Sequence, residues 1–449
     1  MSSLPTGLRD RPLAAAARLA NRRGRVLLHS ARDDDGLGAW SFCAAEPTAT
    51  LIARGHSLVR LDRDGRPANR FTGDPFEAME AFLAEFGCTL GPRAGGPPDV
   101  RVIGFLSYDL ARVIEQLPGG PRLGHDVPDL WLAAYPAVAR WCDGADGEVV
   151  GPDAAARDAL AAMLASGPTE PGVPPSFGPL VADDDANHHM ARVEKIRDYL
   201  AAGDVYQVNL ARRHVARILA PGDALALYRV LADVAPAPYG AMIEADGITV
   251  ISGSPERFLA SSGDRIETRP IKGTRPRIPG GADELAAAEK DAAEHLMIVD
   301  LERNDLGRIA ETGSVRVDEL GYVVELPALY HKVSRVSAKS RAGIGYGALL
   351  RATFPGGSIT GAPKVRAMEL IDELEPARRG PYFGAFGYFG AGGVFDLAIA
   401  IRIGVLRSNE LRVHVGGGIV ADSDPAAELA ETELKAKGWV EALATLARE

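Results

Sequence analysis

The chain has 449 residues, of which 46% are hydrophobic and 24% charged, a composition typical of a globular protein with a large core. Its 60 acidic residues outnumber its 50 basic residues and no basic block stands out, so we expect no nucleic-acid partner. No run of about 18 apolar residues occurs, so we expect no membrane-spanning helix and no membrane partner. The three cysteines are far apart and lack metal-ligand spacing, which indicates buried thiols in a reducing, cytoplasmic compartment.

Composition divides the chain into three regions. Residues 1–150 contain short predicted strands, such as 26–30 and 102–108, mixed with helical segments. Residues 151–184 are rich in proline, glycine and acidic side chains, which predicts a linker or surface connection. Residues 185–449 open with a helix at 186–202, where apolar residues recur at helical spacing before a glycine.

A strand is predicted directly after this helix. Tyr206, Val208 and Leu210 alternate with Gln207 and Asn209, so the two amides share the face opposite the apolar one. That polar face either meets a ligand or is solvated.

A lysine and a glutamate stand near the ends of two further predicted strands. Glu256 follows the apolar run 248–252, and Lys272 lies sixteen residues later on a predicted loop beside Gly273. Gly273 has no Cβ and therefore permits close approach of a ligand or another backbone. An amine and a carboxyl group over one pocket can act as nucleophile and proton donor. The alternative is an ion pair on a surface hairpin.

Two later segments suggest anion and metal binding. In the predicted helix 282–303, Asp291 and Glu294 share one face, where carboxylates are either solvated or hold a metal. The glycine-rich stretch 356–364 predicts a loop that opens a helix, with Pro363 as the first helical residue. Such a loop offers backbone N–H groups to an anion such as a small carboxylate. It lacks the lysine of a nucleotide-binding Walker loop.

An arginine ends an alternating strand pattern over 395–402. Arg402 falls on the face that carries Ala398 and Ala400, which suits bidentate binding of a carboxylate. Tyr388, on a preceding predicted strand, is expected to lie beside Arg402 on the same carboxylate-binding surface. The alternative is an ion pair between Arg402 and a neighbouring acidic residue.

The last predicted helix carries three charged residues on one face. A glycine-rich strand, Gly416–Gly418, leads through a turn into this helix, whose predicted N-cap is Asp424 and first residue Pro425. Within the helix, Glu428, Glu431 and Lys435 are spaced by three and four residues. They form either a solvated ion-pair stripe or oxygen ligands for Mg²⁺.

Seven segments, in their residues and in their order along the chain, together resemble the chorismate-utilising enzymes. This family includes the large subunits of anthranilate and aminodeoxychorismate synthases and the isochorismate and salicylate synthases. The segments are Gly203–Leu210, Ser254–Phe258, Thr268–Thr274, Ala293–Asp300, Arg303–Arg308, Ser358–Lys364 and Gly416–Ser423. The resemblance implies an α+β fold, namely an anthranilate-synthase-like α/β sandwich. Its two large, mostly antiparallel sheets would be flanked by helices and built from both 1–150 and 185–449.

Two positions distinguish branches of the family. Anthranilate synthases carry alanine where this chain has Lys272, and isochorismate and salicylate synthases carry lysine where it has Gln207. The chain therefore resembles the aminodeoxychorismate branch. Glu302 departs from the family pattern, in which an apolar residue is usual.

The resemblance also implies roles for individual residues. Lys272 would attack the chorismate ring while Glu256 protonates the departing hydroxyl. Mg²⁺ would be held by Glu294 and Glu431, with Glu428 and Asp291 in support. Substrate-binding positions implied by the family are Arg402, Tyr388, Gly416, Gly417, Gly418, Thr274, His331, Thr360, Lys435 and Gln207.

The resemblance implies chorismate and ammonia as substrates. Ammonia would come from a separate glutamine amidotransferase subunit, because the chain contains no recognisable amidotransferase segment. The product would be 4-amino-4-deoxychorismate, a precursor of 4-aminobenzoate and folate. Two alternatives stay open, namely anthranilate synthase component I and a non-catalytic chorismate-binding subunit.

Overall fold

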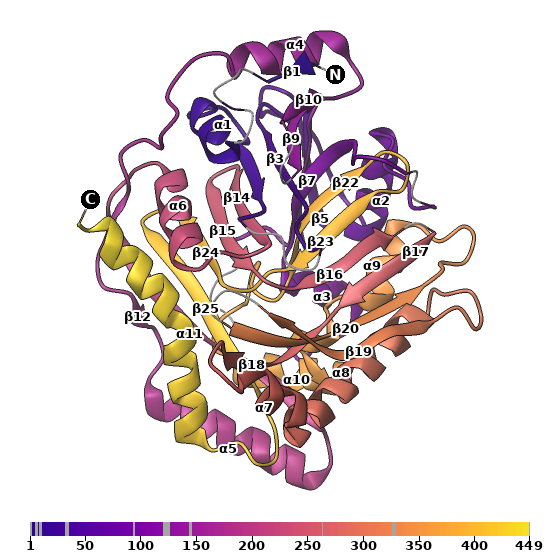
Figure 1. The fold of residues 1–449 in the computed structure, drawn as a ribbon, viewed down its shortest axis with the longest axis vertical. Helices are drawn as coiled ribbons and strands as arrows, with labels where there is room; N and C mark the ends of the chain where they lie inside the picture. The colour runs from indigo at the N-terminus through magenta and orange to yellow at the C-terminus, as the bar shows by residue number, and fades with distance from the viewer. Residues whose placement is uncertain are drawn as a thin grey trace.

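The computed structural model describes residues 2–4, 8, 11–31, 36–92, 95–119, 126–142, 146–262, 264–325 and 329–448. Two large antiparallel sheets dominate it, and helices cover their outer faces (Figure 1).

The first sheet takes strands from both ends of the chain. Its order is β1 (Ser2–Ser3), β10 (Glu148–Val150), β9 (Val138–Cys142), β3 (Trp40–Ala44), β2 (Val26–His29), β14 (Tyr239–Ala245), β15 (Ile248–Ser254), β24 (Ile403–Arg407), β25 (Glu410–Ile419), β13 (Gln207–Ala220) and β11 (Ser176–Phe177), and β13 also pairs with β12 (Val181–Ala182) and β21 (Gly361–Ala362).

The second sheet mixes early and late strands in the same way. Its order is β18 (Ile271–Pro276), β20 (Leu329–Ala338), β17 (Arg265–Arg269), β16 (Arg257–Ser262), β23 (Phe395–Ile399), β22 (Ala385–Gly390), β7 (Val100–Leu106), β8 (Leu130–Ala134), β4 (Ala49–Arg54), β5 (Ser57–Leu61) and β6 (Pro67–Thr72), and β19 (Arg316–Glu325) pairs with β20.

The helices pack against strands of both sheets. They are α1 (Pro12–Arg18), α2 (Pro75–Glu85), α3 (Ala111–Ile114), α4 (Ala154–Met163), α5 (Ala186–Ala202), α6 (Ala224–Val234), α7 (Gly281–Ala287), α8 (Glu289–Gly307), α9 (Tyr346–Thr353), α10 (Lys364–Leu374) and α11 (Pro425–Leu446), with single 3₁₀ turns η2 (Tyr108–Leu110) and η3 (Gly357–Ile359). Among the described residues, no helix combines the length and apolar character needed to cross a membrane.

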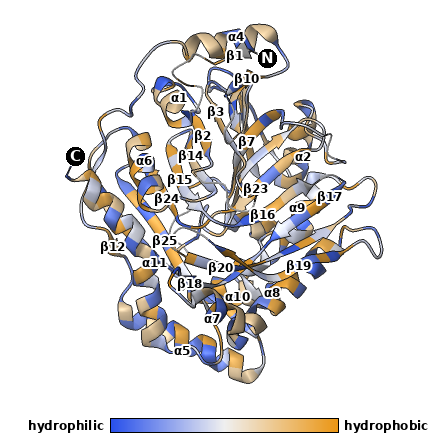
Figure 2. Cartoon of the chain, in the orientation of Figure 1, coloured by the Kyte–Doolittle hydropathy of each residue, from blue (hydrophilic) through white to orange (hydrophobic). Residues whose placement is uncertain are grey.

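The core has two parts because successive residues of a strand point to opposite faces. In β15, Val250 joins the large apolar cluster between the sheets, while Ile251 packs into a second cluster under α1, α6 and α11. Figure 2 shows hydrophobic residues concentrated on the strands, and mixed surfaces on the outer helices α5 and α11. The first sheet is therefore apolar on both faces.

The predicted helix boundaries agree with the structure in two places and differ in two. The helix expected at 186–202 is α5, and α11 begins at Pro425 after Asp424, whose side chain accepts from the Ala427 N–H at 2.8 Å. The helix expected at 282–303 is two helices, α7 and α8, because Ala288 has extended backbone (ψ 99°). Pro363 precedes α10 as its N-cap and is not its first residue.

The segment predicted as a linker contains regular structure. Helix α4 lies within residues 151–184, and the short strands β11 and β12 pair with β13. The division of the chain into three regions stays a prediction, and each sheet contains strands from both 1–150 and 185–449.

Candidate active site

Glu256 and Lys272 are brought together by a hairpin, as the sequence predicted. Strands β16 and β17 pair so that Arg257 lies opposite Arg269, which places Glu256, before β16, beside β18. The carboxyl Oε1 of Glu256 accepts from the Ile271 N–H at 3.5 Å. Glu256 is buried, so the surface ion-pair interpretation is wrong.

Lys272 lies in a strand and not in the predicted loop. The β18–β20 register shifts between Lys272 and Thr274, so Gly273 forms a bulge with φ of +76°. A Cβ on Gly273 would lie 2.9 Å from Leu285 Cδ1 and 3.3 Å from Asp291 Oδ2, so the expected close approach is made by α7 and α8.

Glu256 and Lys272 share one partner, Ser358 of η3. The Ser358 hydroxyl donates to Glu256 Oε1 at 2.8 Å, and the Ser358 carbonyl oxygen accepts from Lys272 Nζ at 3.0 Å. The Asn209 side-chain amide also donates to that carbonyl at 3.4 Å. One residue of the glycine-rich loop therefore contacts both proposed catalytic groups.

The surroundings shift the pKa of each group toward the form its proposed role needs. Burial raises the pKa of Glu256, although the Ser358 hydroxyl and the charge of Lys272 oppose this shift. Burial lowers the pKa of Lys272, against the attraction of Glu256 and Glu294. Loss of hydration thus favours a protonated acid and a neutral amine.

The charged residues of α11 face the glycine strand β25. A Cβ on Gly417 would lie 3.4 Å from Glu428 Oε2 and from Glu431 Oε1, and 3.7 Å from Lys435 Nζ. Lys435 Nζ pairs with Glu431 at 2.6 Å and donates to the Gly416 carbonyl at 2.7 Å. The predicted common face is confirmed, and it is directed at the backbone of β25.

Glu294 and Asp291 approach the site from α8. The pKa of Lys272 responds to the charges of both Glu294 and Glu431, so α8 and α11 bring carboxylates within electrostatic range of the same amine. Asp291 instead pairs with Arg275 at 2.9 Å.

The donor set fits Mg²⁺ in chemical type. Across the described part of the chain, no three or more His, Cys, Asp or Glu side chains are gathered as a metal cluster. Glu294, Glu428 and Glu431 supply only oxygen donors, and Mg²⁺ commonly takes one or two protein carboxylates together with substrate and water. These three residues are the ones that would hold it.

The two amides of β13 lie on a buried face. Gln207 and Asn209 are 0% and 4% exposed, which excludes the solvated interpretation. The Gln207 amide packs on Gly418, where an added Cβ would meet Nε2 at 2.2 Å. Both polar atoms of the Gln207 side chain are buried without a hydrogen-bond partner among the described residues. A ligand over Gly418 would offer that amide a partner.

Thr274, His331 and Thr360 are held by the protein itself. The Thr274 hydroxyl lies 2.9 Å from His331 Nδ1 across the β18–β20 pair. The Thr360 hydroxyl donates to the Gly356 carbonyl oxygen at 3.0 Å, within the glycine-rich loop. In this arrangement Thr360 shapes the loop.

Arg402 lies in a connection between the sheets and not in the predicted strand. Strand β23 ends at Ile399, and Arg402 has φ of +48° immediately before β24. Within the described residues it has no ion-pair partner, so nothing there supports the predicted alternative of pairing with a neighbouring acid. Arg402 is exposed. It is thus available to an anion.

The structure does not bring Tyr388 to Arg402. Tyr388 lies opposite Asp396 within the second sheet, whereas Arg402 lies beyond the end of β23, in the connection to β24. Its ring packs against Phe42, with centroids 4.7 Å apart. Sequence reasoning missed Tyr382 and Phe383, which adjoin the Arg402 segment because the Phe383 N–H donates to the Ala400 carbonyl at 2.8 Å.

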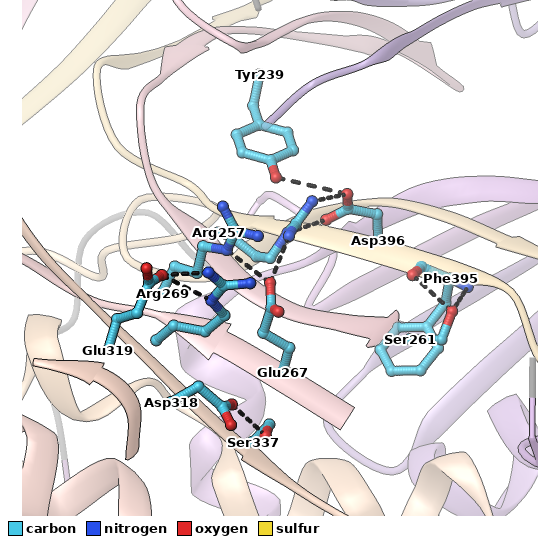
Figure 3. Close-up of polar contacts among 11 residues, drawn as sticks. Tyr239, Arg257, Ser261, Glu267, Arg269, Asp318, Glu319, Ser337, Phe395 and Asp396 are labelled. Carbon is cyan, nitrogen blue, oxygen red and sulfur yellow. Dashed lines mark hydrogen bonds and ion pairs between the residues drawn. The ribbon is translucent and has the colours of Figure 1, made fainter. Parts of the chain in front are cut away.

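Tyr388 instead lines a separate cavity of about 250 Å³ between the sheets. Arg257 spans this cavity's charged wall, donating to Asp396 at 2.8 Å and to Glu267 at 2.7 Å (Figure 3). Arg269 also donates to Glu267, at 2.6 Å, and the Tyr239 hydroxyl donates to Asp396 at 3.4 Å. These charges largely neutralise one another, and none of Ser358, Glu256 and Lys272 lines this cavity.

Comparisons with known proteins agree with this geometry. The chain matches the family model described as chorismate binding enzyme over residues 34–441. It is 39% identical to aminodeoxychorismate synthase component 1 of Klebsiella aerogenes, covering 92% of each chain. It is 36% identical to anthranilate synthase component 1 of Streptomyces coelicolor (strain ATCC BAA-471 / A3(2) / M145), covering 96% of this chain and 91% of that one. A crystal structure of anthranilate synthase component I from Streptococcus pneumoniae TIGR4 superposes with a TM-score of 0.78 at 29% identity, covering 90% and 92% of the two chains, which confirms the predicted fold.

Proposed function

The chain belongs to the chorismate-binding enzyme family, and on that basis we propose that it is the large subunit of an aminodeoxychorismate synthase. It would convert chorismate and ammonia to 4-amino-4-deoxychorismate. The observation that supports this choice is that the amine of Lys272 and the carboxyl of Glu256 are held on one residue, Ser358. Glu256 is buried and Lys272 half-buried, and loss of hydration shifts the pKa of each toward its neutral form.

Each residue has a defined task in this reaction. The neutral amine of Lys272 attacks ring carbon C2, the two ring double bonds shift, and the C4–oxygen bond breaks. Glu256 donates its proton to the departing hydroxyl, which leaves as water. Ammonia then adds at C4, the double bonds shift back, and the C2–nitrogen bond to Lys272 breaks.

The remaining site residues bind the substrate. The guanidinium of Arg402 would bind a carboxylate of chorismate, and the Gln207 amide and the strand Gly416–Gly418 would line the ring's position. Mg²⁺, held by Glu294 and Glu431 with Glu428, would neutralise the second carboxylate. Tyr388 keeps only the family resemblance as support, because the structure places it at the other cavity.

Two further proposals concern the partner and the use of the product. The name component 1, carried by relatives of both synthase types, implies a second component, and we propose a glutamine amidotransferase that supplies ammonia. The product would serve 4-aminobenzoate and folate synthesis.

Product analysis tests the reaction. Purified protein with chorismate, Mg²⁺ and an ammonium salt should form 4-amino-4-deoxychorismate, detected by mass spectrometry. Lys272→Ala should lose that product or divert turnover to anthranilate. Anthranilate as the main wild-type product would move the chain to the anthranilate synthases, and isochorismate would move it to a third branch. Absence of turnover even with an amidotransferase and glutamine would favour a non-catalytic subunit.

A further inference from the structure

A third buried acid lies behind the loop that joins the proposed catalytic groups. Glu302, on α8, is 3% exposed, and its Oε1 accepts from the Gly357 N–H at 3.0 Å. The glycine-rich loop was expected to offer backbone N–H groups to an external carboxylate. At Gly357, the carboxyl group comes from the protein itself.

This contact is one step from both reacting groups. Gly357 precedes Ser358, whose hydroxyl binds Glu256 and whose carbonyl oxygen binds Lys272. The turn is also tightly fitted against α8, since a Cβ on Gly357 would lie 2.7 Å from Leu301 Cδ2 and 3.1 Å from Glu302 Oε1. A shift of the Glu302 carboxyl therefore moves the turn and, with it, the atoms that hold Glu256 and Lys272.

Burial and the neighbouring acids favour the neutral form of Glu302. Burial raises its pKa to about 8 and the nearby Asp305 and Glu256 add to the rise, while Lys364 and the hydrogen bond from the Gly357 N–H oppose it. Lys364 is itself engaged by Asp305 and by the Thr353 carbonyl oxygen. A protonated Glu302 can accept from Gly357 without repelling Glu256. Its other oxygen, Oε2, is buried without a partner among the described residues, so the carboxyl is not explained by a completed hydrogen-bond network.

We propose that Glu302 is a positioning residue for the amination reaction, which sets the Gly357–Ser358 turn and through it the relative placement of Glu256 and Lys272. This inference rests on the proposed function.

Three substitutions separate positioning from simple packing. Glu302→Gln keeps a neutral acceptor at the same distance and should retain kcat within about twofold. Glu302→Leu keeps the volume without the acceptor, and Glu302→Asp keeps the acid but withdraws the acceptor by one methylene. Both should lower kcat on the order of tenfold with little change in KM, because misplacement of reacting groups affects the chemical step. Should the leucine variant fail to fold, the aspartate variant still decides the question.

Asp129 provides a matched control away from the proposed site. Its carboxyl group also accepts from a glycine N–H, that of Gly55, at 2.6 Å, and burial raises its pKa to about 6. Asp129→Asn should leave kcat unchanged. If the wild type forms product, two results would overturn the inference. One is a kcat in Glu302→Asp equal to that of the wild type, and the other is an equal loss of kcat in Glu302→Gln and Glu302→Asp. A wild type that does not turn over chorismate would overturn the proposed function and this inference together.

Discussion

Ser358 affects Glu256 and Lys272 through different atoms, so its side chain can be removed without removing its backbone contact. Ser358→Ala deletes the hydroxyl that lowers the pKa of Glu256 and leaves the carbonyl that binds Lys272. Loss of one such hydrogen bond costs about 1 kcal/mol, so we expect kcat to fall about fivefold.

The pH profile of Ser358→Ala gives the sharper test. Glu256 must be protonated to act as an acid, so activity falls as pH rises through its pKa. Because the variant removes a contact that lowers this pKa, the alkaline fall in kcat should move to higher pH. The profile is measured against wild type and Ser358→Thr, which keeps a hydroxyl. An unchanged or acid-shifted profile would contradict Glu256 as the proton donor.

At the same scale, the sequence singled out Glu256 and Lys272, the proposed reacting groups, but not the residues that hold them in place. Glu256 and Lys272 stand in one hairpin, whose turn and strand signals are local. Ser358 reaches Glu256 across 102 positions, and Gly357 meets Glu302 across 55. Such contacts depend on how α8 packs against η3, and no local periodicity records that packing.

Among the elements, the pairing of α11 with β25 makes a specific prediction for metal affinity. Gly417→Ala places a methyl at ordinary contact distance from Glu428 and Glu431, so the chain should fold normally. The methyl nonetheless occupies the space between strand and carboxylates, and we expect Mg²⁺ affinity to fall about tenfold in a titration of activity or by calorimetry.

Gly438 provides the control within the same helix, because nothing lies within 4 Å of a Cβ added there. Gly438→Ala should leave Mg²⁺ affinity unchanged and stabilise the protein by about 1 kcal/mol, since alanine favours a helix interior. Equal Mg²⁺ affinity in the Gly417 and Gly438 variants would argue against a metal site at this junction.

Element boundaries were predictable where a capping residue marked them and not where the chain changes sheets. Asp424 and Pro425 predicted the start of α11. The run ending at Arg402 alternates without interruption, yet the chain leaves the second sheet after Ile399 and enters the first at Ile403. Alternation has the same period in both sheets, so it contains no signal for the crossing.

For the whole molecule, Arg25 links residues 1–150 to residues 185–449. Its guanidinium, 2% exposed, donates to Asp223 and to Glu244 at 2.6 Å each, joining β2 to α6 and β14. Removing one partner of a buried ionic network leaves uncompensated charges, so Arg25→Ala should lower the free energy of unfolding by about 3–5 kcal/mol in urea denaturation.

Arg22 supplies the matched control, because its pair with Glu46 is nearly half exposed on both sides. Arg22→Ala should change stability by less than about 1 kcal/mol. If the two regions form one cooperative unit, Arg25→Ala shifts a single transition. Two transitions, of which only the earlier moves, would instead indicate regions that unfold separately.

The two-sheet architecture itself came from the resemblance to a family and not from periodicity. Alternating patterns located many of the strands. Strands β13 and β25, however, pair with each other across about 200 residues of sequence, and nothing in the pattern of one strand specifies the other strand as its neighbour. Hydrophobic alternation fixes which face is buried and leaves the neighbour undetermined.

The interleaved strand order has a consequence for how the molecule is made. Strand β2 pairs with β14, β15 with β24, and β13 with β25, and in each pair the second strand is much later in the chain. One edge of each earlier strand therefore stays unpaired until the later strand is synthesised. Such non-local pairing slows folding and prolongs the time during which unpaired strand edges are exposed to other chains. Since Gly416–Gly418 and α11 belong to the proposed site, a nascent chain on the ribosome would complete that site only when nearly all of the chain has emerged.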